Sequence, residues 1–161
     1  MTPIAELIES IRSNPRHALN PPAAEEEISF AEERLQVALP DDLREFYLLS
    51  NGCVLFLNGS DFRYWLLPLE DVRPARMLVY GIDDDTFGPG NCFAIADVCD
   101  GNYVGALFGN PGRSVNYVDV FHETFAENWS TIIASSFTEF LRRASGSNEL
   151  YWLRPDFDKV E

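Results

Sequence analysis

Cationic side chains are scarce in this sequence. Its 161 residues include 12 Lys and Arg against 26 Asp and Glu, which gives a formal net charge of −14 at pH 7. The negative electrostatic field of a protein with this charge repels phosphate backbones and anionic lipid surfaces. The composition therefore argues against binding to nucleic acid or to a membrane. The same field attracts a basic protein and speeds its encounter. A requirement for solubility alone is the alternative explanation of the charge.

Long apolar runs are also missing. No stretch approaches the roughly 20 residues of a membrane-spanning helix, and the N-terminus, MTPIAELIES, lacks the basic head and apolar core of a secretory signal. We therefore expect a cytoplasmic protein. The length fits a single domain covering residues 1–161, and a hydrophobic content of 46% is ordinary for a globular chain.

Residues that bind metals or form disulfides are few. The chain has two histidines, and the spacing of its three cysteines, Cys53, Cys92 and Cys99, does not match a zinc site. In a cytoplasmic protein such cysteines are expected to be reduced and mostly buried. A disulfide between Cys92 and Cys99 is the alternative.

Signatures of catalysis are absent as well. The segment Gly88-Pro89-Gly90 lacks the Lys and Ser/Thr of a phosphate-binding loop, and no Gly-x-Ser-x-Gly elbow occurs. His122-Glu123 falls at the end of an expected strand and not in an HExxH helix, so we expect a hydrogen-bonded histidine at a sheet edge. The sequence predicts a protein that is not an enzyme and that needs no cofactor or metal.

One acidic cluster, Asp83-Asp84-Asp85, nevertheless suggests a cation site. Carboxylates are ligands for hard cations such as calcium, but consecutive side chains point in different directions, and the alternating spacing of a calcium loop is missing. We expect a solvated acidic loop suited to contact with a basic partner. A metal-dependent hydrolase that uses this loop is the alternative.

The most informative part of the sequence is the stretch from Ile28 to Gly52, which predicts two consecutive helices. An apolar stripe at helical spacing predicts a helix that ends at Leu39-Pro40, because proline has no backbone N–H with which to continue it. Asp41-Asp42 then begins a second helix at its positive end, and Asn51-Gly52 ends it. The stripe of the first helix consists of Ile28, Ala31, Leu35 and Leu39.

Glu32 lies beside this stripe and not opposite it. A carboxylate at the border of a core is costly unless it is hydrogen-bonded. We expect Glu32 to accept backbone N–H groups near the Pro40 turn and so to tie the two helices together. A glutamate that simply reaches water is the alternative.

After Gly52 the pattern changes to short apolar runs separated by turn residues, which indicates sequential strands. We expect strands at residues 54–57, 62–67, 93–98, 103–108 and 115–121, a strand or helix end at 77–81, and turns at Asp100-Gly101-Asn102 and Gly109–Gly112. A helical stripe over residues 130–144 predicts a last helix, and Tyr151–Leu153 predicts an extra strand or a tail packed on the core.

An amphipathic helix that starts at Thr2-Pro3 and ends at Asn14-Pro15 comes first, and residues 16–23 then form a linker. Helices followed by sequential strands and a final helix predict an α+β fold. Its parts are N-terminal helices, a central and mainly antiparallel sheet of about five to six strands, and a C-terminal helix packed on that sheet.

The stretch from Ile28 to Gly52 also resembles the signature of the SUKH superfamily, the Smi/Knr-type domain. The resemblance rests on the order Ile28…Glu32…Leu35…Leu39-Pro40-Asp41…Phe46-Tyr47…Asn51-Gly52, followed by Trp65 with Leu67–Glu70, Phe93–Asp97, Val120–Glu123 and a last helix at residues 134–141. It covers about residues 24–144 and implies a SUKH-like fold. Val37 stands where the family usually has a glycine. The implied structural signature is Glu32, Leu39, Pro40, Asn51 and Gly52.

The resemblance also implies a function. Bacterial members resemble immunity proteins that bind and neutralise polymorphic or contact-dependent toxins, many of which are basic nucleases. We therefore expect a non-catalytic immunity protein with a basic toxin domain as its partner. A general interaction or regulatory module of the same fold is the alternative.

Aromatic side chains on strands, beside carboxylates, are typical of a protein-binding surface. The residues predicted on this basis to bind the partner are Trp65, Asp83, Asp84, Asp85, Asp97, Asp100 and Tyr103.

Overall fold

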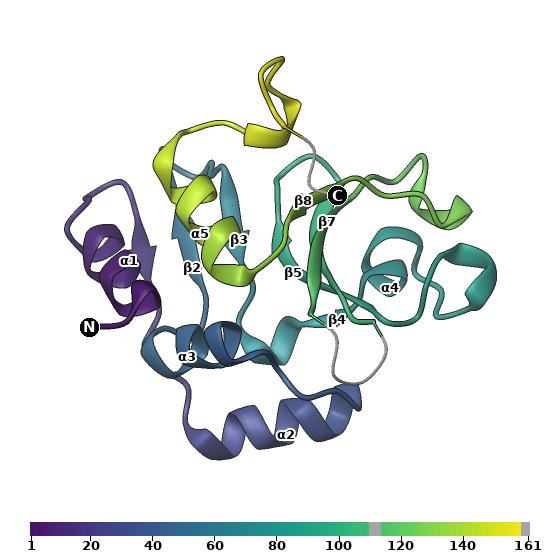
Figure 1. The fold of residues 1–161 in the computed structure, drawn as a ribbon, viewed down its shortest axis with the longest axis horizontal. Helices are drawn as coiled ribbons and strands as arrows, with labels where there is room; N and C mark the ends of the chain where they lie inside the picture. The colour runs from purple at the N-terminus through teal and green to yellow at the C-terminus, as the bar shows by residue number, and fades with distance from the viewer. Residues whose placement is uncertain (110–113, 159–161) are drawn as a thin grey trace.

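A computed structural model describes residues 1–109 and 114–158, which fold into one sheet with helices packed against it (Figure 1). The helices are α1 (Pro3–Arg12), α2 (Glu25–Leu35), α3 (Asp41–Leu49), α4 (Ala75–Tyr80) and α5 (Phe137–Gly146). The strands are β1 (Ala18–Leu19), β2 (Cys53–Leu55), β3 (Tyr64–Leu66), β4 (Arg73–Pro74), β5 (Cys92–Asp97), β6 (Tyr103–Leu107), β7 (Asn116–Val120) and β8 (Ile132–Ala134). Single 3-10 turns are η1 (Leu69–Asp71), η2 (Asp85–Phe87), η3 (Phe125–Glu127) and η4 (Tyr151–Leu153).

The strands of the sheet are hydrogen-bonded in the order β1-β2-β3-β5-β6-β7-β8. The remaining strand, β4, is not part of this series and pairs with β5. All of these pairings are antiparallel. The α+β class and the C-terminal helix are confirmed, but within the described residues the sheet has eight strands and not about five to six. The additional strands β1, β4 and β8 have only two or three residues, which is too short for an alternating pattern to appear in the sequence.

Of the two alternatives for residues 77–81, the helix end is confirmed: helix α4 ends at Tyr80, and Gly81 stops it in the left-handed conformation. One predicted helix is corrected. The predicted helix over residues 130–144 begins only at Phe137, because the Ser136 side chain accepts a hydrogen bond from Glu139 N and so fixes the N-cap there. The preceding residues form strand β8.

The predictions for the linker, the C-terminal tail and the second turn have different outcomes. The linker at residues 16–23 contains the short strand β1. Tyr151 and Trp152 are buried in turn η4, so the tail does pack on the core, although it forms no strand. Of the turn predicted at Gly109–Gly112, residues Asn110–Gly112 lie outside the described residues.

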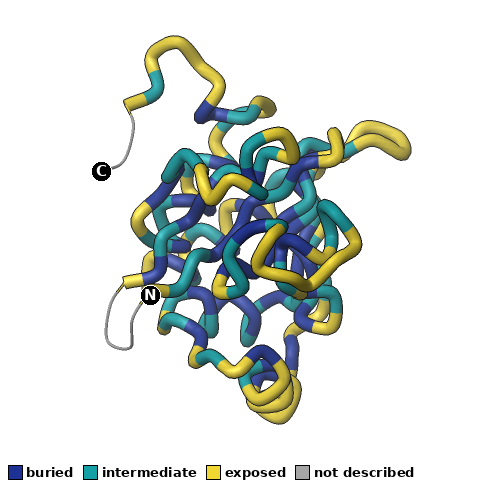
Figure 2. The backbone as a smooth tube through the Cα atoms, turned by 90° about the vertical axis from the view of Figure 1, so that its right-hand side faces the viewer, coloured by how far each residue is buried: buried dark blue, intermediate teal, exposed yellow. Residues whose placement is uncertain are grey.

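Helices α1, α3 and α5 pack on one another and cover one face of the sheet. Aromatic rings join this layer to the strands: Phe140 of α5 lies 6.0 Å from Tyr64 of β3 and 6.4 Å from Tyr117 of β7, measured between ring centroids. Helix α4 contacts β5 and β6 and lies on the other side of β5 from α5 (Figure 1). Figure 2 shows the buried backbone in the middle of the molecule and the exposed turns of α2 at its lower end.

Glu32 joins α2 to the Pro40 turn, as the sequence predicts. Its Oε2 accepts a hydrogen bond of 2.7 Å from the backbone N–H of Leu39. Helix α2 ends at Leu35 and not at Leu39 as predicted, because Gln36 takes the left-handed conformation with φ of 60° and its N–H bonds back to the helix. The glycine-favouring position of this turn is therefore Gln36, and a non-glycine residue is tolerated at it.

Replacing Glu32 by alanine is expected to lower the free energy of unfolding by about 1–2 kcal/mol, because a charge-assisted hydrogen bond to the backbone is lost. Urea unfolding measures the effect. Glu33→Ala on the exposed side of the same helix is the control and is expected to change stability by less than about 0.5 kcal/mol. Equal effects of the two substitutions would contradict this role of Glu32.

None of the helices within residues 1–109 and 114–158 has the length and hydropathy needed to cross a membrane.

Candidate functional site

Three of the predicted partner-binding residues lie side by side on neighbouring strands. Trp65 of β3 is directly opposite Asp97 of β5, and Asp97 is directly opposite Tyr103 of β6. Directly opposed residues of antiparallel strands project from the same face of the sheet. Trp65, Asp97 and Tyr103, which we call the aromatic–acidic row, therefore form one continuous strip across three strands.

The row projects away from the layer formed by α1, α3 and α5. Tyr64, the neighbour of Trp65, contacts Phe140 of α5, and successive residues of a strand point to opposite faces. All three members of the row are partly exposed. Phe62 packs edge-on against Trp65, with ring centroids 6.3 Å apart, and so widens the aromatic surface at this end of the strip.

A rigid turn holds Asp97 in place. Its Oδ1 accepts a hydrogen bond of 2.8 Å from Cys99 N, and Asp100 Oδ1 accepts one of 3.1 Å from Asn102 N. These side-chain bonds stabilise the turn between β5 and β6, in which Cys99 has a φ of 74°. Asp100 therefore lies on the same hairpin as two members of the row, close to them along the chain.

The row combines burial with negative charge. Partial burial, with a smaller contribution from the nearby Asp97 carboxylate, raises the pKa of the Tyr103 hydroxyl. Tyr103 therefore stays neutral at physiological pH. The row thus presents one carboxylate between two neutral aromatic side chains, a combination that suits a Lys or Arg side chain.

A second carboxylate, Asp119 of β7, lies on the opposite face of the sheet. Burial, together with the charge of Asp100, raises the pKa of Asp119 to about 6, and the Trp152 side chain partly offsets this rise. Asp119 is directly opposite Val104, the neighbour of Tyr103 in β6, so it points toward the α5 layer and cannot contribute to the row.

The Asp83–Asp85 loop has a different structural partner. Arg76 of α4, with only 10% of its side chain exposed, donates from Nε to Asp83 Oδ1 at 2.7 Å and from Nη1 to Asp85 Oδ1 at 2.8 Å. Its Nη1 also bonds the Gly88 carbonyl. Asp84 accepts from Thr86 N, and hydrogen bonds from Thr86 lower the pKa of the Asp84 carboxyl.

Two of the three carboxylates in this loop are thus already paired with an internal cation. Their outer oxygens remain open, since the Asp85 side chain is 99% exposed and that of Asp83 is 52% exposed. Among the described residues, no hydrogen bond or ion pair links this loop to the aromatic–acidic row. The seven predicted residues therefore fall into two groups, one on the sheet with the Asp100 turn and one beside α4.

His122 is held by hydrogen bonds to a neighbouring side chain. Both its backbone N–H, at 2.8 Å, and its ring Nδ1, at 2.7 Å, contact Asn102 Oδ1. Across residues 1–109 and 114–158, no three His, Cys, Asp or Glu side chains come together as metal ligands would. The three cysteines are free thiols, and burial raises the pKa of both Cys53 and Cys92 to about 12.

The predicted structural signature fixes the turn η1 against the helices. Asn51 Oδ1 accepts from Leu69 N at 2.9 Å, and Tyr47 OH donates to the Leu67 carbonyl at 2.8 Å. Gly52 has a φ of 90°, and an added Cβ would lie 2.6 Å from the Leu66 carbonyl oxygen. Helix α3 itself ends earlier than predicted, at Leu49, because Ser50 is already extended. The Asn51-Gly52 pair therefore does not end α3 but allows η1 to approach the helices closely.

Two features of the surface were not predicted from the sequence. Arg76, which organises the Asp83–Asp85 loop, gave no signal, because a single arginine in an apolar segment has no characteristic spacing. Phe30 of α2 is 68% exposed. A signal for Phe30 was present, since this aromatic residue falls outside the apolar stripe of its helix.

Comparison with known proteins adds one finding. The model of the family described as SMI1 / KNR4 family (SUKH-1) matches residues 22–143, a stretch that contains the aromatic–acidic row, the Asp83–Asp85 loop and the whole structural signature. No curated protein matches the chain.

Proposed function

Because the chain belongs to the SMI1 / KNR4 family (SUKH-1), we propose that it is a non-catalytic, cytoplasmic immunity protein that binds and neutralises a cognate bacterial toxin domain with a basic surface. The observation that supports this proposal most is the aromatic–acidic row. The row offers the charge and the contact area that a basic protein surface requires, on a face of the sheet that α1, α3 and α5 leave free.

The spacing of the row suits one basic side chain. Adjacent strands lie about 4.8 Å apart, so the backbones of Trp65 and Tyr103, which flank Asp97, are separated by about 10 Å. The shorter Asp97 side chain leaves a gap between the two larger ones. An arginine or lysine of the partner can enter this gap, pair with the carboxylate and lie against the aromatic faces.

The remaining predicted residues act at longer range in this proposal. Asp100 extends the negative charge at the hairpin turn, and the outer oxygens of Asp83, Asp84 and Asp85 add to the field of a chain with a net charge of −14. Exposed charges of this kind chiefly raise the association rate, whereas partly buried aromatic contacts slow dissociation. Because many toxins of this type are nucleases, a basic nuclease domain is the partner that fits best.

Binding to the toxin domain encoded by the neighbouring gene is expected to depend on the row. Trp65→Ala and Tyr103→Ala should each weaken the complex by about 30-fold, mainly through faster dissociation. Asp97→Asn should weaken it by about tenfold, while the asparagine oxygen still accepts the Cys99 N–H and preserves the turn. Biolayer interferometry at several salt concentrations measures both rates, and the association rate should fall about tenfold between 50 and 500 mM salt.

Glu6→Gln is the control, because Glu6 is exposed on α1 and its removal changes the net charge by the same amount as Asp97→Asn. It should leave the dissociation rate unchanged. The purified protein should also block the toxin's activity at equimolar concentration. A tight complex that none of the three row substitutions weakens would reject the row as the binding surface, and the absence of any complex would reject the immunity function.

A further inference from the structure

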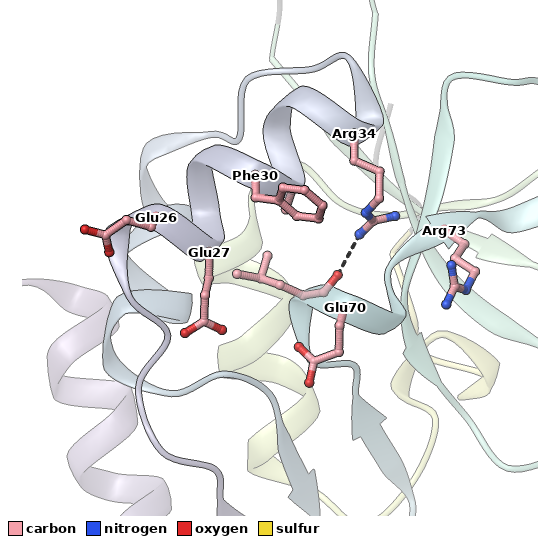
Figure 3. A pocket seen from close by; sticks show the side chains of 8 residues that line it. Glu26, Glu27, Phe30, Arg34, Glu70 and Arg73 are labelled. Atoms are coloured by element: carbon pink, nitrogen blue, oxygen red, sulfur yellow. Dashed lines mark hydrogen bonds between the residues drawn. The ribbon is translucent and has the colours of Figure 1, made fainter.

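A groove lies between helix α2 and the turn η1, away from the aromatic–acidic row. It has a volume of about 430 Å³ and is lined by Glu26, Glu27, Phe30, Ala31, Arg34, Leu69, Glu70 and Arg73. Figure 3 shows the Phe30 ring directed from α2 toward the turn η1, which carries Glu70. Phe30, which is 68% exposed, therefore forms one wall of this groove.

The groove is formed before any ligand arrives, because the side chains of Arg34 and Asn51 hold η1 and its C-cap residue Val72 with four hydrogen bonds. Arg34 of α2 donates from Nη1 to the Val72 carbonyl and from Nη2 to the Leu69 carbonyl, both at 2.8 Å. Asn51 Oδ1 accepts from Leu69 N, and Asn51 Nδ2 bonds Glu70 Oε2 at 3.3 Å. A site whose floor is already ordered loses little conformational entropy on binding.

The charges around the groove are separated. Figure 3 shows the Glu27 and Glu70 carboxylates together at one end, while Arg34 and Arg73 lie at the other. Within the described residues, no Lys, Arg or His lies within 4.0 Å of the carboxylates of Glu26, Glu27 or Glu70. The Arg34 guanidinium, by contrast, is occupied by two backbone carbonyls.

We propose that the α2–η1 groove is a docking site for a protein segment in which a lysine or arginine stands beside a large apolar side chain. The cation pairs with the Glu27 and Glu70 end, and the apolar side chain packs between Phe30, Ala31 and Leu69. Charge complementarity selects this occupant, because no cation of residues 1–109 and 114–158 pairs with the acidic end and an acidic segment would meet repulsion there. The volume accommodates one large side chain with its adjacent backbone.

The α2–η1 groove is a second surface, and its docking role does not depend on whether the chain neutralises a toxin. Phe30 lies outside the apolar stripe by which α2 packs on the core, so its side chain is not part of the hydrophobic core. The neighbouring Glu27 and Glu70 carboxylates accept hydrogen bonds from Ala24 N and Asn51 Nδ2 but have no cationic partner among the described residues. An exposed aromatic side chain beside such carboxylates is typical of an interface anchor.

The test is an NMR titration of the intact 15N-labelled protein with three short peptides. Ac-Leu-Arg-Leu-NH2 is expected to cause saturable shifts of the backbone amides of Phe30, Ala31, Leu69 and Glu70. Ac-Leu-Glu-Leu-NH2 and Ac-Gly-Arg-Gly-NH2 should bind at least tenfold more weakly, because each lacks one of the two features that the groove recognises. Phe30→Ala and Glu70→Gln should each weaken the binding of the first peptide about tenfold.

Two controls have matched chemistry. Leu153 is also 68% exposed but lies in η4, and Glu33 lies on α2 outside the groove, so Leu153→Ala and Glu33→Gln should leave binding unchanged. Because Phe30 is mostly exposed, its replacement should not alter the unfolding temperature. Shifts that centre on the aromatic–acidic row, equal binding of the acidic peptide, insensitivity to Phe30→Ala, or no saturable shift would each overturn the proposal.

Discussion

Replacing Gly52 by alanine is expected to lower the free energy of unfolding by about 3–4 kcal/mol. Two effects add at this position. The backbone has a φ of 90°, which a side chain disfavours, and the new Cβ would lie 2.6 Å from the Leu66 carbonyl oxygen and 2.9 Å from Pro68 N. Both contacts are with backbone atoms, which cannot rotate aside as a flexible side chain does. Urea unfolding of the purified protein measures the effect.

Gly101→Ala separates the two effects. Gly101 has a nearly identical φ of 86°, but an added Cβ would meet no atom within 4 Å. Only the conformational term remains, so this substitution should cost about 1 kcal/mol. If the two variants lose the same stability, close packing of η1 on Gly52 is not the reason for a glycine at this position.

Gly52→Ala should also disturb the α2–η1 groove. The substitution pushes on the segment Leu66–Pro68, which leads directly into η1, whereas Gly101 lies in a distant hairpin turn. Titration with the basic peptide should therefore show weaker binding for Gly52→Ala at low temperature, where the variant remains folded. The Gly101→Ala variant should bind normally.

Asp119→Asn is expected to stabilise the protein by about 3 kcal/mol at pH 7.5. Burial, together with the charge of Asp100, raises the pKa of Asp119 to about 6 in the folded state, compared with 3.8 when exposed. Each pKa unit corresponds to about 1.4 kcal/mol, so ionising this carboxyl at neutral pH disfavours the folded state by about 3 kcal/mol. Asparagine has nearly the same shape and carries no charge, and its side-chain oxygen can still face Trp152.

The gain should depend on pH with a defined sign. Because the folded-state pKa lies above the unfolded one, the folded protein binds more protons between pH 4 and 6, and the wild type loses stability as the pH rises through this window. The advantage of Asp119→Asn should be complete above pH 7 and fall to about half by pH 5. Urea titrations at pH 5, 6 and 7.5 measure it, and 13C NMR follows the carboxyl directly.

Asp61→Asn provides the matched comparison. Asp61 is exposed in the turn between β2 and β3, so the same chemical change should alter stability by less than about 0.5 kcal/mol at every pH. An Asp119 carboxyl that titrates near pH 4, or a variant that is no more stable than the wild type at pH 7.5, would show that water reaches this side chain freely.

Several features of the fold follow from local rules. Helix α1 starts where the Thr2 side chain accepts the Ala5 N–H ahead of Pro3, so short-range hydrogen bonding places this end. The predicted end of α2 at Leu39-Pro40 was four residues too late, because Gln36 takes the left-handed conformation directly after Leu35. The Glu32 bond was predictable because a carboxylate beside an apolar stripe needs a nearby donor. The hairpin around Gly101 follows from its turn residues.

Other features depend on distant parts of the chain. Ile132–Ala134 continues the apolar spacing of α5, and only pairing with β7 makes this segment a strand. Two-residue strands such as β4 likewise exist because β5 is already in place. The pairing of Arg76 with Asp83 and Asp85 could not be predicted, because it depends on how the turn after α4 brings the loop back against that helix.

The sequence alone determined the α+β class, the paired helices with their Glu32 tie, the strongly acidic character and the residues Trp65, Asp97 and Tyr103 as candidates for binding. Composition and short-range spacing carry these properties, because each depends on a residue and its near neighbours along the chain. Only the tertiary structure decided that Trp65, Asp97 and Tyr103 stand in one row, that the Asp83–Asp85 loop is tied to Arg76, and that Phe30 faces η1 across a groove. Strand register and the packing of η1 on α2 set these placements, and both arise from contacts between residues far apart in the sequence.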